Sequence, residues 1–324
     1  MKLIRNAFLT LAALVALVLI VGGLYVAARQ HLVFDAPYPA VAASADSAVI
    51  ARGRYLVRHL ADCGDCHGDP ARRPAYLQGE EIALSGGREW QIPPGRFRAP
   101  NITPDRETGI GRMTDGAIAR ALRYGVGRDG RALLPFMEMQ GLSDQDVAAV
   151  ISYLRSQPPV ANVVPPHQYN LLGMIVKATV LAKPVGPKGA PPSLAPAGPS
   201  VESGRYLAEN VSNCWACHTQ RDMNTGAIVG PRYGGTTGFT DDFDPQRSWS
   251  PPNITAGATT GRLARYSEEQ FMARFRAGRA IPGSPMPWQA FGGMSDDDLR
   301  SIYRFLRSLP PIEREVGPAV VEKR

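Results

Sequence analysis

Cysteine and histidine are scarce in this chain of 324 residues, which contains four cysteines and five histidines. All four cysteines fall in two Cys-x-x-Cys pairs, so none remains for a structural disulfide if both pairs serve the same purpose. Runs of Lys or Arg are also lacking. The formal net charge is +7, but residues 46–160 and residues 201–324 each carry 15 basic and 14 acidic side chains. The electrostatic footprint of a nucleic-acid-binding protein is therefore missing.

Long alternating strand patterns are absent as well, and only one long apolar run occurs. Residues 7–28 form 22 positions without a charge, preceded by Lys2 and Arg5. A helix of that length covers roughly 33 Å, enough to cross the hydrocarbon core of a bilayer. We expect a membrane anchor with a cytoplasmic N-terminus. A cleaved signal peptide is the alternative, because 26–28 resembles a cleavage site, and either interpretation exports the rest of the chain.

An internal duplication runs through that exported part. Gly53-Arg54-Tyr55-Leu56 recurs as Gly204-Arg205-Tyr206-Leu207, and Pro100-Asn101-Ile102-Thr103 recurs as Pro252-Asn253-Ile254-Thr255. Matches in the same order at nearly one offset indicate two copies of one domain. The expected segments are an anchor or signal segment at 1–30, a first domain at 46–160, a proline-rich linker at 161–200, a second domain at 201–312 and a C-terminal tail at 313–324.

Each copy is expected to fold as a few helices around loops. Ser143 and Ser295 have the features of N-caps, each followed by an acidic residue three positions later and by apolar residues on one helix face. Thr114 and Ser267 mark the starts of shorter middle helices. A further helix leads into each cysteine pair, so the expected fold class is all-α.

The linker contains eight prolines, which favours an extended, semi-rigid spacer between the two domains. Within it, residues 171–182 are apolar apart from Lys177, but this stretch is too short to span a bilayer. We expect a helix packed on one domain, with contact to a membrane surface as the alternative.

Two motifs carry the chemistry: Cys63-Gly64-Asp65-Cys66-His67 and Cys214-Trp215-Ala216-Cys217-His218. Cys-x-x-Cys-His is the attachment pattern of c-type haem, in which two thiols form thioethers with one porphyrin and the adjacent histidine ligates the iron. A thioredoxin-like redox pair does not need the histidine twice, and structural zinc lacks four nearby ligands in each domain. The sequence therefore predicts two covalently attached haem c groups.

A methionine is the expected second axial ligand of each iron. Met286 follows His218 by 68 residues, and Met137 follows His67 by 70. We expect Met137 and Met286 to be metal ligands, with Met139 as the alternative in the first domain. Bis-histidine ligation in both domains is not supported, because no other histidine recurs in both copies. We expect His59 at the surface or beside a haem propionate. The histidines outside the motifs are His31, His59 and His167.

Each half resembles a class I cytochrome c domain, with a glycine and an aromatic residue in the first helix, the Cys-x-x-Cys-His motif and a methionine loop. The whole of 46–312 resembles membrane-bound tandem dihaem cytochromes c. With the stretches 101–105 and 108–111 it is also similar to the cytochrome subunits of bacterial periplasmic alcohol, aldehyde and gluconate dehydrogenases. Those subunits usually carry three haem motifs, whereas this chain has two. The resemblance also implies that the carbonyl groups of Pro100 and Pro252, or near neighbours, orient the ligating histidines.

Histidine and methionine together saturate the iron, so we expect one-electron transfer and no catalytic residues. The expected protein is a relay in the bacterial inner membrane with both haem domains in the periplasm. It would pass electrons from a dehydrogenase subunit or a quinol to a soluble cytochrome or a terminal oxidase. The alternative is a dihaem redox enzyme with one open haem, either a peroxidase or a sulfur-compound dehydrogenase, and a gas sensor is a third option.

Overall fold

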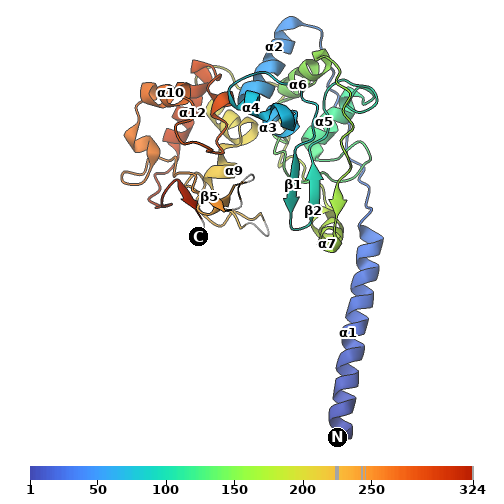
Figure 1. Ribbon diagram of the computed structural model, residues 1–324. Coiled ribbons are helices and arrows are strands. Elements are labelled where there is room, and N and C mark those ends of the chain that lie inside the picture. Colours follow the sequence, from blue (N-terminus) through green and yellow to red (C-terminus); the bar gives the residue numbers. More distant parts are fainter. Residues whose placement is uncertain (223–225, 242–243, 245, 323–324) are drawn as a thin grey trace.

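The computed structural model describes residues 1–222, 226–241, 244 and 246–322. Its first helix, α1 (Lys2–Arg29), projects from a body formed by the rest of the chain (Figure 1). No residue of α1 is buried. Within the described residues it is the one helix whose length and composition suffice to cross a membrane. The apolar helix expected near the N-terminus is therefore present, and a membrane anchor and a signal sequence share these properties.

The first repeat (residues 46–160) and the second repeat (residues 201–312) share one order of main helices. In each, a short helix continues into a π-helical turn, a five-residue helix carries the Cys-x-x-Cys-His motif, and a 13-residue helix comes last. The elements of the first repeat are α2 (Ser47–Tyr55), η1 (Leu56–Leu60), α3 (Cys63–His67), η2 (Pro70–Arg72), α4 (Arg73–Leu77), β1 (Glu89–Ile92), β2 (Gly95–Arg98), α5 (Asp115–Tyr124) and α6 (Asp144–Ser156). Those of the second are α8 (Val201–Tyr206), η4 (Leu207–Val211), α9 (Cys214–His218), β4 (Phe239–Thr240), β5 (Arg247–Trp249), η5 (Arg262–Arg265), α10 (Glu268–Arg276), α11 (Trp288–Phe291) and α12 (Asp296–Ser308).

In each repeat the first and last helices cross at a glycine. A Cβ atom on Gly53 would overlap the main-chain oxygen of Ala149 in α6. A Cβ atom on Gly204 would overlap that of Ser301 in α12 in the same way. Only a residue without a side chain permits this approach. The glycine of each Gly-Arg-Tyr-Leu motif thus sets the helix crossing on which the haem motif is built.

The predicted helix starts are confirmed. The side chains of Thr114, Ser143, Ser267 and Ser295 each accept a hydrogen bond from a backbone N–H in the first turn of the following helix. Ser267 and Gln270 form a complete capping box at the start of α10. Such caps satisfy backbone donors that the helix itself leaves without partners.

The expectation of an all-α fold is only partly correct, because the chain also forms two small antiparallel sheets, ordered β1-β2-β3 and β4-β5-β6. Their strands contain two to four residues, too few to show an alternating pattern in sequence. The third strand of each sheet comes from outside its repeat. These strands are β3 (Gln168–Tyr169) from the linker and β6 (Val320–Glu322) from the C-terminal tail.

The linker does not behave as the extended spacer that its prolines suggest. It lies against both repeats. The backbone N–H of Asp144 in the first repeat donates to the carbonyl oxygen of Pro192, and the hydroxyl of Ser301 in the second repeat donates to the carbonyl oxygen of Gly198. Proline carbonyls remain hydrogen-bond acceptors, so a proline-rich segment can bind a helix terminus. The helix expected in the linker is present as α7 (Leu171–Thr179), followed by a 3₁₀ turn, η3 (Val180–Ala182).

The two repeats pack directly on each other, and one hydrophobic core runs through both. Leu56, Val57 and Leu60 of η1 belong to this core together with Leu207 and Val211 of η4. The two π-helical turns are in contact. Because each haem motif follows its π-helical turn in the chain, this contact brings the motifs of the two repeats to one junction.

Candidate haem sites and the junction between them

The same local structure places both Cys-x-x-Cys-His motifs. A residue in the left-handed conformation, Asp62 (φ 51°) or Asn213 (φ 47°), separates the π-helical turn from the helix of the motif. Asp and Asn are among the residues that tolerate this conformation best. Cysteines three positions apart then lie on one face of a single helical turn. Each pair of thiols can therefore reach a single porphyrin.

The first cysteine of each pair is half-buried. Burial raises the pKa of the Cys63 thiol and of the Cys214 thiol to about 12 in each case. A dithiol redox site needs the opposite shift, because its nucleophile is the thiolate. The raised thiol pKa values therefore argue against a dithiol redox site at either motif.

Both motif histidines are held by a proline carbonyl. His67 Nδ1 donates to the carbonyl oxygen of Pro100 at 2.9 Å, and His218 Nδ1 donates to that of Pro252 at 2.8 Å. Burial lowers the pKa of both imidazoles, which favours the neutral form that binds a metal. With the proton on Nδ1, the lone pair lies on Nε2. The hydrogen bonds that the family resemblance implies for Pro100 and Pro252 are therefore present.

An asparagine next to each proline holds the carbonyl-bearing loop, a role that the sequence analysis missed. The side-chain oxygen of Asn101 accepts hydrogen bonds from the backbone N–H and the hydroxyl of Thr103. Its side-chain amide donates to the main-chain oxygen of Val160. Asn253 repeats these contacts in the second repeat with Thr255 and Ile312. Both asparagines are buried. The recurrence of Pro-Asn-Ile-Thr in both copies was the signal that could have revealed this role.

The donor sets at both motifs fit haem c. Each combines two thiols on one helical turn with a neutral imidazole whose orientation is fixed by a main-chain acceptor. Cys63, Cys66 and His67 would hold one haem c. Cys214, Cys217 and His218 would hold the other.

The methionine loops offer the second axial ligand. Met139 and Met286 are half-buried and pack against the hydrophobic core. Met137 is also half-buried, and its carbonyl accepts a hydrogen bond of 3.0 Å from the side-chain amide of Gln140. Ligation by Met137 and Met286 remains a prediction, and Met139 remains the alternative in the first repeat.

His59 lies between the repeats instead of at an open surface. Its Nδ1 is 3.2 Å from the carbonyl oxygen of Ala290 in α11, and its ring lies against Gly293. His167 accepts a hydrogen bond from the backbone N–H of Arg98. His59 is thus half-buried, because residues more than two hundred positions away pack against it, and the alternative position beside a haem propionate remains a prediction.

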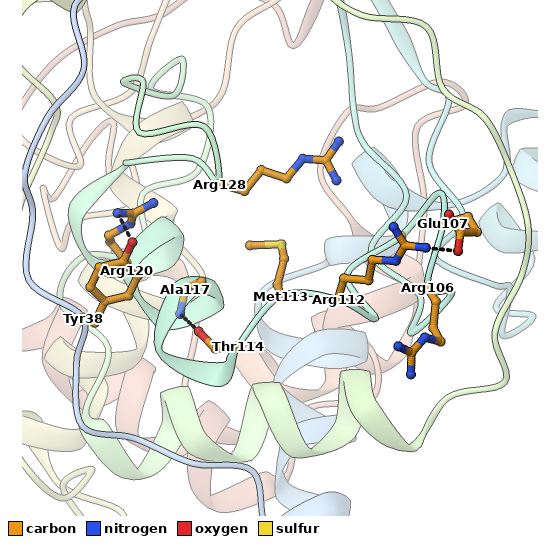
Figure 2. Close-up of a pocket in the computed structure, with 10 residues that line it drawn as sticks. Tyr38, Arg106, Glu107, Arg112, Met113, Thr114, Ala117, Arg120 and Arg128 are labelled. Atoms are coloured by element: carbon orange, nitrogen blue, oxygen red, sulfur yellow. Dashed lines mark hydrogen bonds and ion pairs between the residues drawn. The ribbon is translucent and has the colours of Figure 1, made fainter.

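A hollow of about 590 Å³ opens on the first repeat (Figure 2). Figure 2 shows the Met113 side chain in the middle of this hollow, with Tyr38 and Arg120 on one side and Arg112 on the other. Arg112 also forms an ion pair with Glu107. None of the ten lining residues belongs to a haem motif. The hollow is thus a cationic feature of the first repeat that is distinct from the haem motifs.

Reciprocal tyrosines join the two repeats. The Tyr55 hydroxyl accepts from the backbone N–H of Ser295 at 2.7 Å and donates to Asp298 at 2.6 Å. The Tyr206 hydroxyl accepts from the backbone N–H of Ser143 at 3.0 Å and donates to the carboxylate of Asp146 at 2.8 Å. The tyrosine of each Gly-Arg-Tyr-Leu motif therefore binds the start of the last helix of the opposite repeat.

Another contact between the two repeats lies directly before the second haem motif. The Asn213 amide, directly before Cys214, donates to the main-chain oxygen of Glu138 at 3.0 Å. Glu138 lies between the two candidate ligands of the first methionine loop, and its carboxylate is 3.5 Å from Arg221. The first methionine loop thus touches the second haem motif.

Comparison with known proteins agrees with this architecture. The sequence profile of the cytochrome c family matches residues 50–158 and 201–310. The chain is 32% identical to the "Alcohol dehydrogenase (quinone), cytochrome c subunit" of Gluconobacter oxydans, over 84% of this chain and 57% of that protein. It is 30% identical to the "Gluconate 2-dehydrogenase cytochrome c subunit" of Pantoea cypripedii, over 82% of this chain and 60% of that protein.

A shorter relative matches along most of its length. The chain is 27% identical to a "Diheme cytochrome c-type" protein of Cereibacter sphaeroides, over 78% of this chain and 83% of that protein. The chain therefore spans less than two thirds of the two dehydrogenase subunits but most of the dihaem protein.

Proposed function

We propose, from the premise that this chain belongs to the cytochrome c family and carries two of its domains in tandem, that it is a membrane-anchored dihaem electron relay. Two family domains and a dihaem relative indicate two covalently bound haem c groups. The observation that carries the proposal is the repetition of one histidine geometry. Nδ1 of each motif histidine is bound to a proline carbonyl in a buried setting.

Haem c, when bound, supplies an iron that gains and loses one electron without group transfer. The residues of this chain would hold that group. The cysteines would tether the porphyrin, Pro100 and Pro252 would orient the histidines, and a methionine from each loop would supply the remaining ligand of the iron. An iron with all its ligands supplied in this way would leave no place for a substrate, which favours electron transfer over the peroxidase or sulfur-compound dehydrogenase alternative.

Contact between the repeats supports exchange of electrons within the molecule. The tyrosine pair and the link between Asn213 and Glu138 hold the two motifs in one packed body. A fixed separation removes the need for a diffusive encounter at that step. We infer that one haem receives the electron and the other passes it on.

We infer that α1 anchors this relay in the bacterial inner membrane, with the N-terminus in the cytoplasm and both repeats in the periplasm. Its length and apolar composition support this inference. Relatives that are cytochrome subunits of alcohol and gluconate dehydrogenases support a dehydrogenase as the electron donor. A quinol is the other donor class, and a soluble cytochrome or a terminal oxidase would accept the electron.

An optical redox titration of the purified holoprotein, with carbon monoxide added to the reduced form, tests the proposal. We expect two low-spin haems that do not bind carbon monoxide. A haem that binds it would reveal an open iron and replace the relay with the dihaem enzyme or the sensor.

A further inference from the structure

The linker helix α7 exposes an apolar face. Leu171, Leu172 and Ile175 have exposed fractions of 74%, 47% and 41%, and Val180, the first residue of η3, is 65% exposed. At 100° per residue, the first three of these fall within about a third of the helix circumference. Grouped apolar side chains of this kind mark a contact with another apolar phase more often than isolated exposed residues do.

The opposite face fixes α7 on the first repeat. Gly173 lies against the main-chain oxygen of Pro94, at a distance that leaves no room for a Cβ atom. The Asn170 side chain caps the helix through Gly173 N–H and donates to the carbonyl of Pro93 at 2.8 Å. At the C-terminal end of the segment, Ala178 of α7 and Leu181 of η3 are buried. The exposed apolar face therefore has a defined direction relative to the repeat.

α7 also adjoins the end of α1. Arg29, the last residue of α1, donates from Nε to the carbonyl oxygen of Ala178 at 3.2 Å. Figure 1 shows α7 at the end of the first repeat from which α1 departs. A bilayer crossed by α1 would have its surface near the last turn of α1. The helix α7 therefore lies at the level where the headgroups of that bilayer would be.

The charges of this segment suit a phospholipid surface. Residues 161–200 contain three lysines and no Asp or Glu. Lys177 lies on α7 itself, with its ammonium 4.9 Å from the centre of the Tyr169 ring. Apolar side chains on one face with basic side chains beside them are typical of helices that lie in the headgroup region.

We propose that α7 lies on the surface of the bilayer that α1 crosses, with Leu171, Leu172 and Ile175 among the lipid headgroups and upper acyl chains. The proposal rests on the membrane anchoring proposed for α1. Two contacts hold a body in one orientation, whereas a single helix lets it rotate. The first repeat is thereby held next to the membrane.

Photo-crosslinking in proteoliposomes tests this contact. The full-length holoprotein is reconstituted in phosphatidylethanolamine and phosphatidylglycerol containing a phospholipid with a diazirine in its acyl chain. Adducts are mapped by mass spectrometry of peptides. We expect adducts on α1 and on 171–180. Leu194 is a control in the same linker: it is 69% exposed and adjoins α6, at the end of the repeat far from α1, and should remain unlabelled (Figure 1).

The outcomes separate the two proposals. Adducts on α1 without adducts on 171–180 would overturn the docking of α7 but leave the anchor intact. In that case solvent or a protein, and not lipid, would cover the exposed face of α7. Absence of adducts from both helices would overturn the anchor itself.

A variant pair gives a second measurement. Leu171→Glu with Ile175→Glu should remove the adducts on α7 and keep those on α1, and Leu194→Glu should change neither. Haem content reports whether the variants fold. Should the double variant fail to fold, the crosslinks of the unaltered protein still decide the question.

Discussion

The two repeats make the same cross-contact in different surroundings. Tyr206 and the carboxylate of Asp146 are buried, and Arg52 adds an ion pair to that carboxylate at 2.9 Å. On the other side of the junction, Tyr55 and Asp298 are only half-buried, and Ser203 occupies the position that matches Arg52. One duplicated motif thus yields one enclosed and one more open contact, because neighbours outside the motif differ.

A second difference lies beside the haem motifs. Arg58 is buried and donates to the Tyr153 hydroxyl and the carbonyl of Ile82, each at 2.8 Å. Its counterpart 151 positions later is Glu209, an acid that pairs with Arg232 at 3.2 Å. Opposite charges at matched positions show that the repeats share the haem-binding frame but surround it differently.

Haem loading is the strongest test of whether the repeats act separately. We expect Cys66→Ser to deprive the first repeat of its normal covalent haem while the second stays loaded, and Cys217→Ser to do the reverse. Each thiol would attach to the porphyrin of its own motif. Intact-protein mass spectrometry and haem absorbance measure the result. Loss of both haems in one variant would show that the shared core makes loading of one repeat depend on the other.

Axial ligation should respond next most strongly. Met286→Ala should turn the second haem high-spin and lower its potential, a change that is a sizeable part of the roughly 0.8 V range that axial ligands span. In the first repeat, Met137→Ala should do the same, with Met139→Ala as its matched control. Optical and redox titration measure both effects. A high-spin haem only in the Met139 variant would assign that residue instead.

The tyrosine pair tests the asymmetry of the junction. Tyr206→Phe removes one hydrogen-bond partner from the buried Asp146 carboxylate and one from the Ser143 N–H. This loss should lower the free energy of unfolding by about 1–3 kcal/mol. Tyr55→Phe removes a hydrogen bond at a more solvent-exposed position, where the free energy of unfolding should fall by about 0.5–1.5 kcal/mol. Urea unfolding, followed by haem absorbance, measures both in one cooperative transition. Equal losses would contradict the difference between the two contacts.

A small acid-dependent difference is expected at the end of the second repeat. Glu313 accepts hydrogen bonds from Thr259 and Thr260, which lower its pKa to about 2, whereas the matching position in the first repeat is Ala161. A carboxylate with a lowered folded-state pKa stabilises the fold above its ordinary pKa and loses that effect as the pH falls toward 2. Glu313→Gln should therefore lower the thermal unfolding temperature slightly at neutral pH and leave it unchanged at pH 2.

Thermal unfolding at both pH values checks this effect. The group is exposed, so the shift should be small. Glu315→Gln, in the same tail, serves as the control. A destabilisation of the Glu313 variant that persists unchanged at pH 2 would show that the carboxylate charge is not the cause.

Several features followed from local sequence because local chemistry determines them. The capped starts of α6, α10 and α12 needed only a Ser and the spacing of the residues that follow. The histidine contact with Pro100 followed from family resemblance and the recurrence of one tetrapeptide. By contrast, the main-chain oxygens that accept from Asn101 and Asn253 lie 59 positions away in each repeat, so no local pattern identifies these acceptors.

The sequence by itself determined the duplication, both haem motifs and the apolar N-terminal helix, since each is a pattern within a short span. Tertiary structure decided how the repeats meet. The strands β3 and β6 come from outside their repeats, and the partners of Tyr55 and His59 lie more than two hundred positions away. Proline content described the stiffness of the linker but not the surfaces it binds. Pairings of that range depend on the packing of complementary surfaces, which no local pattern records.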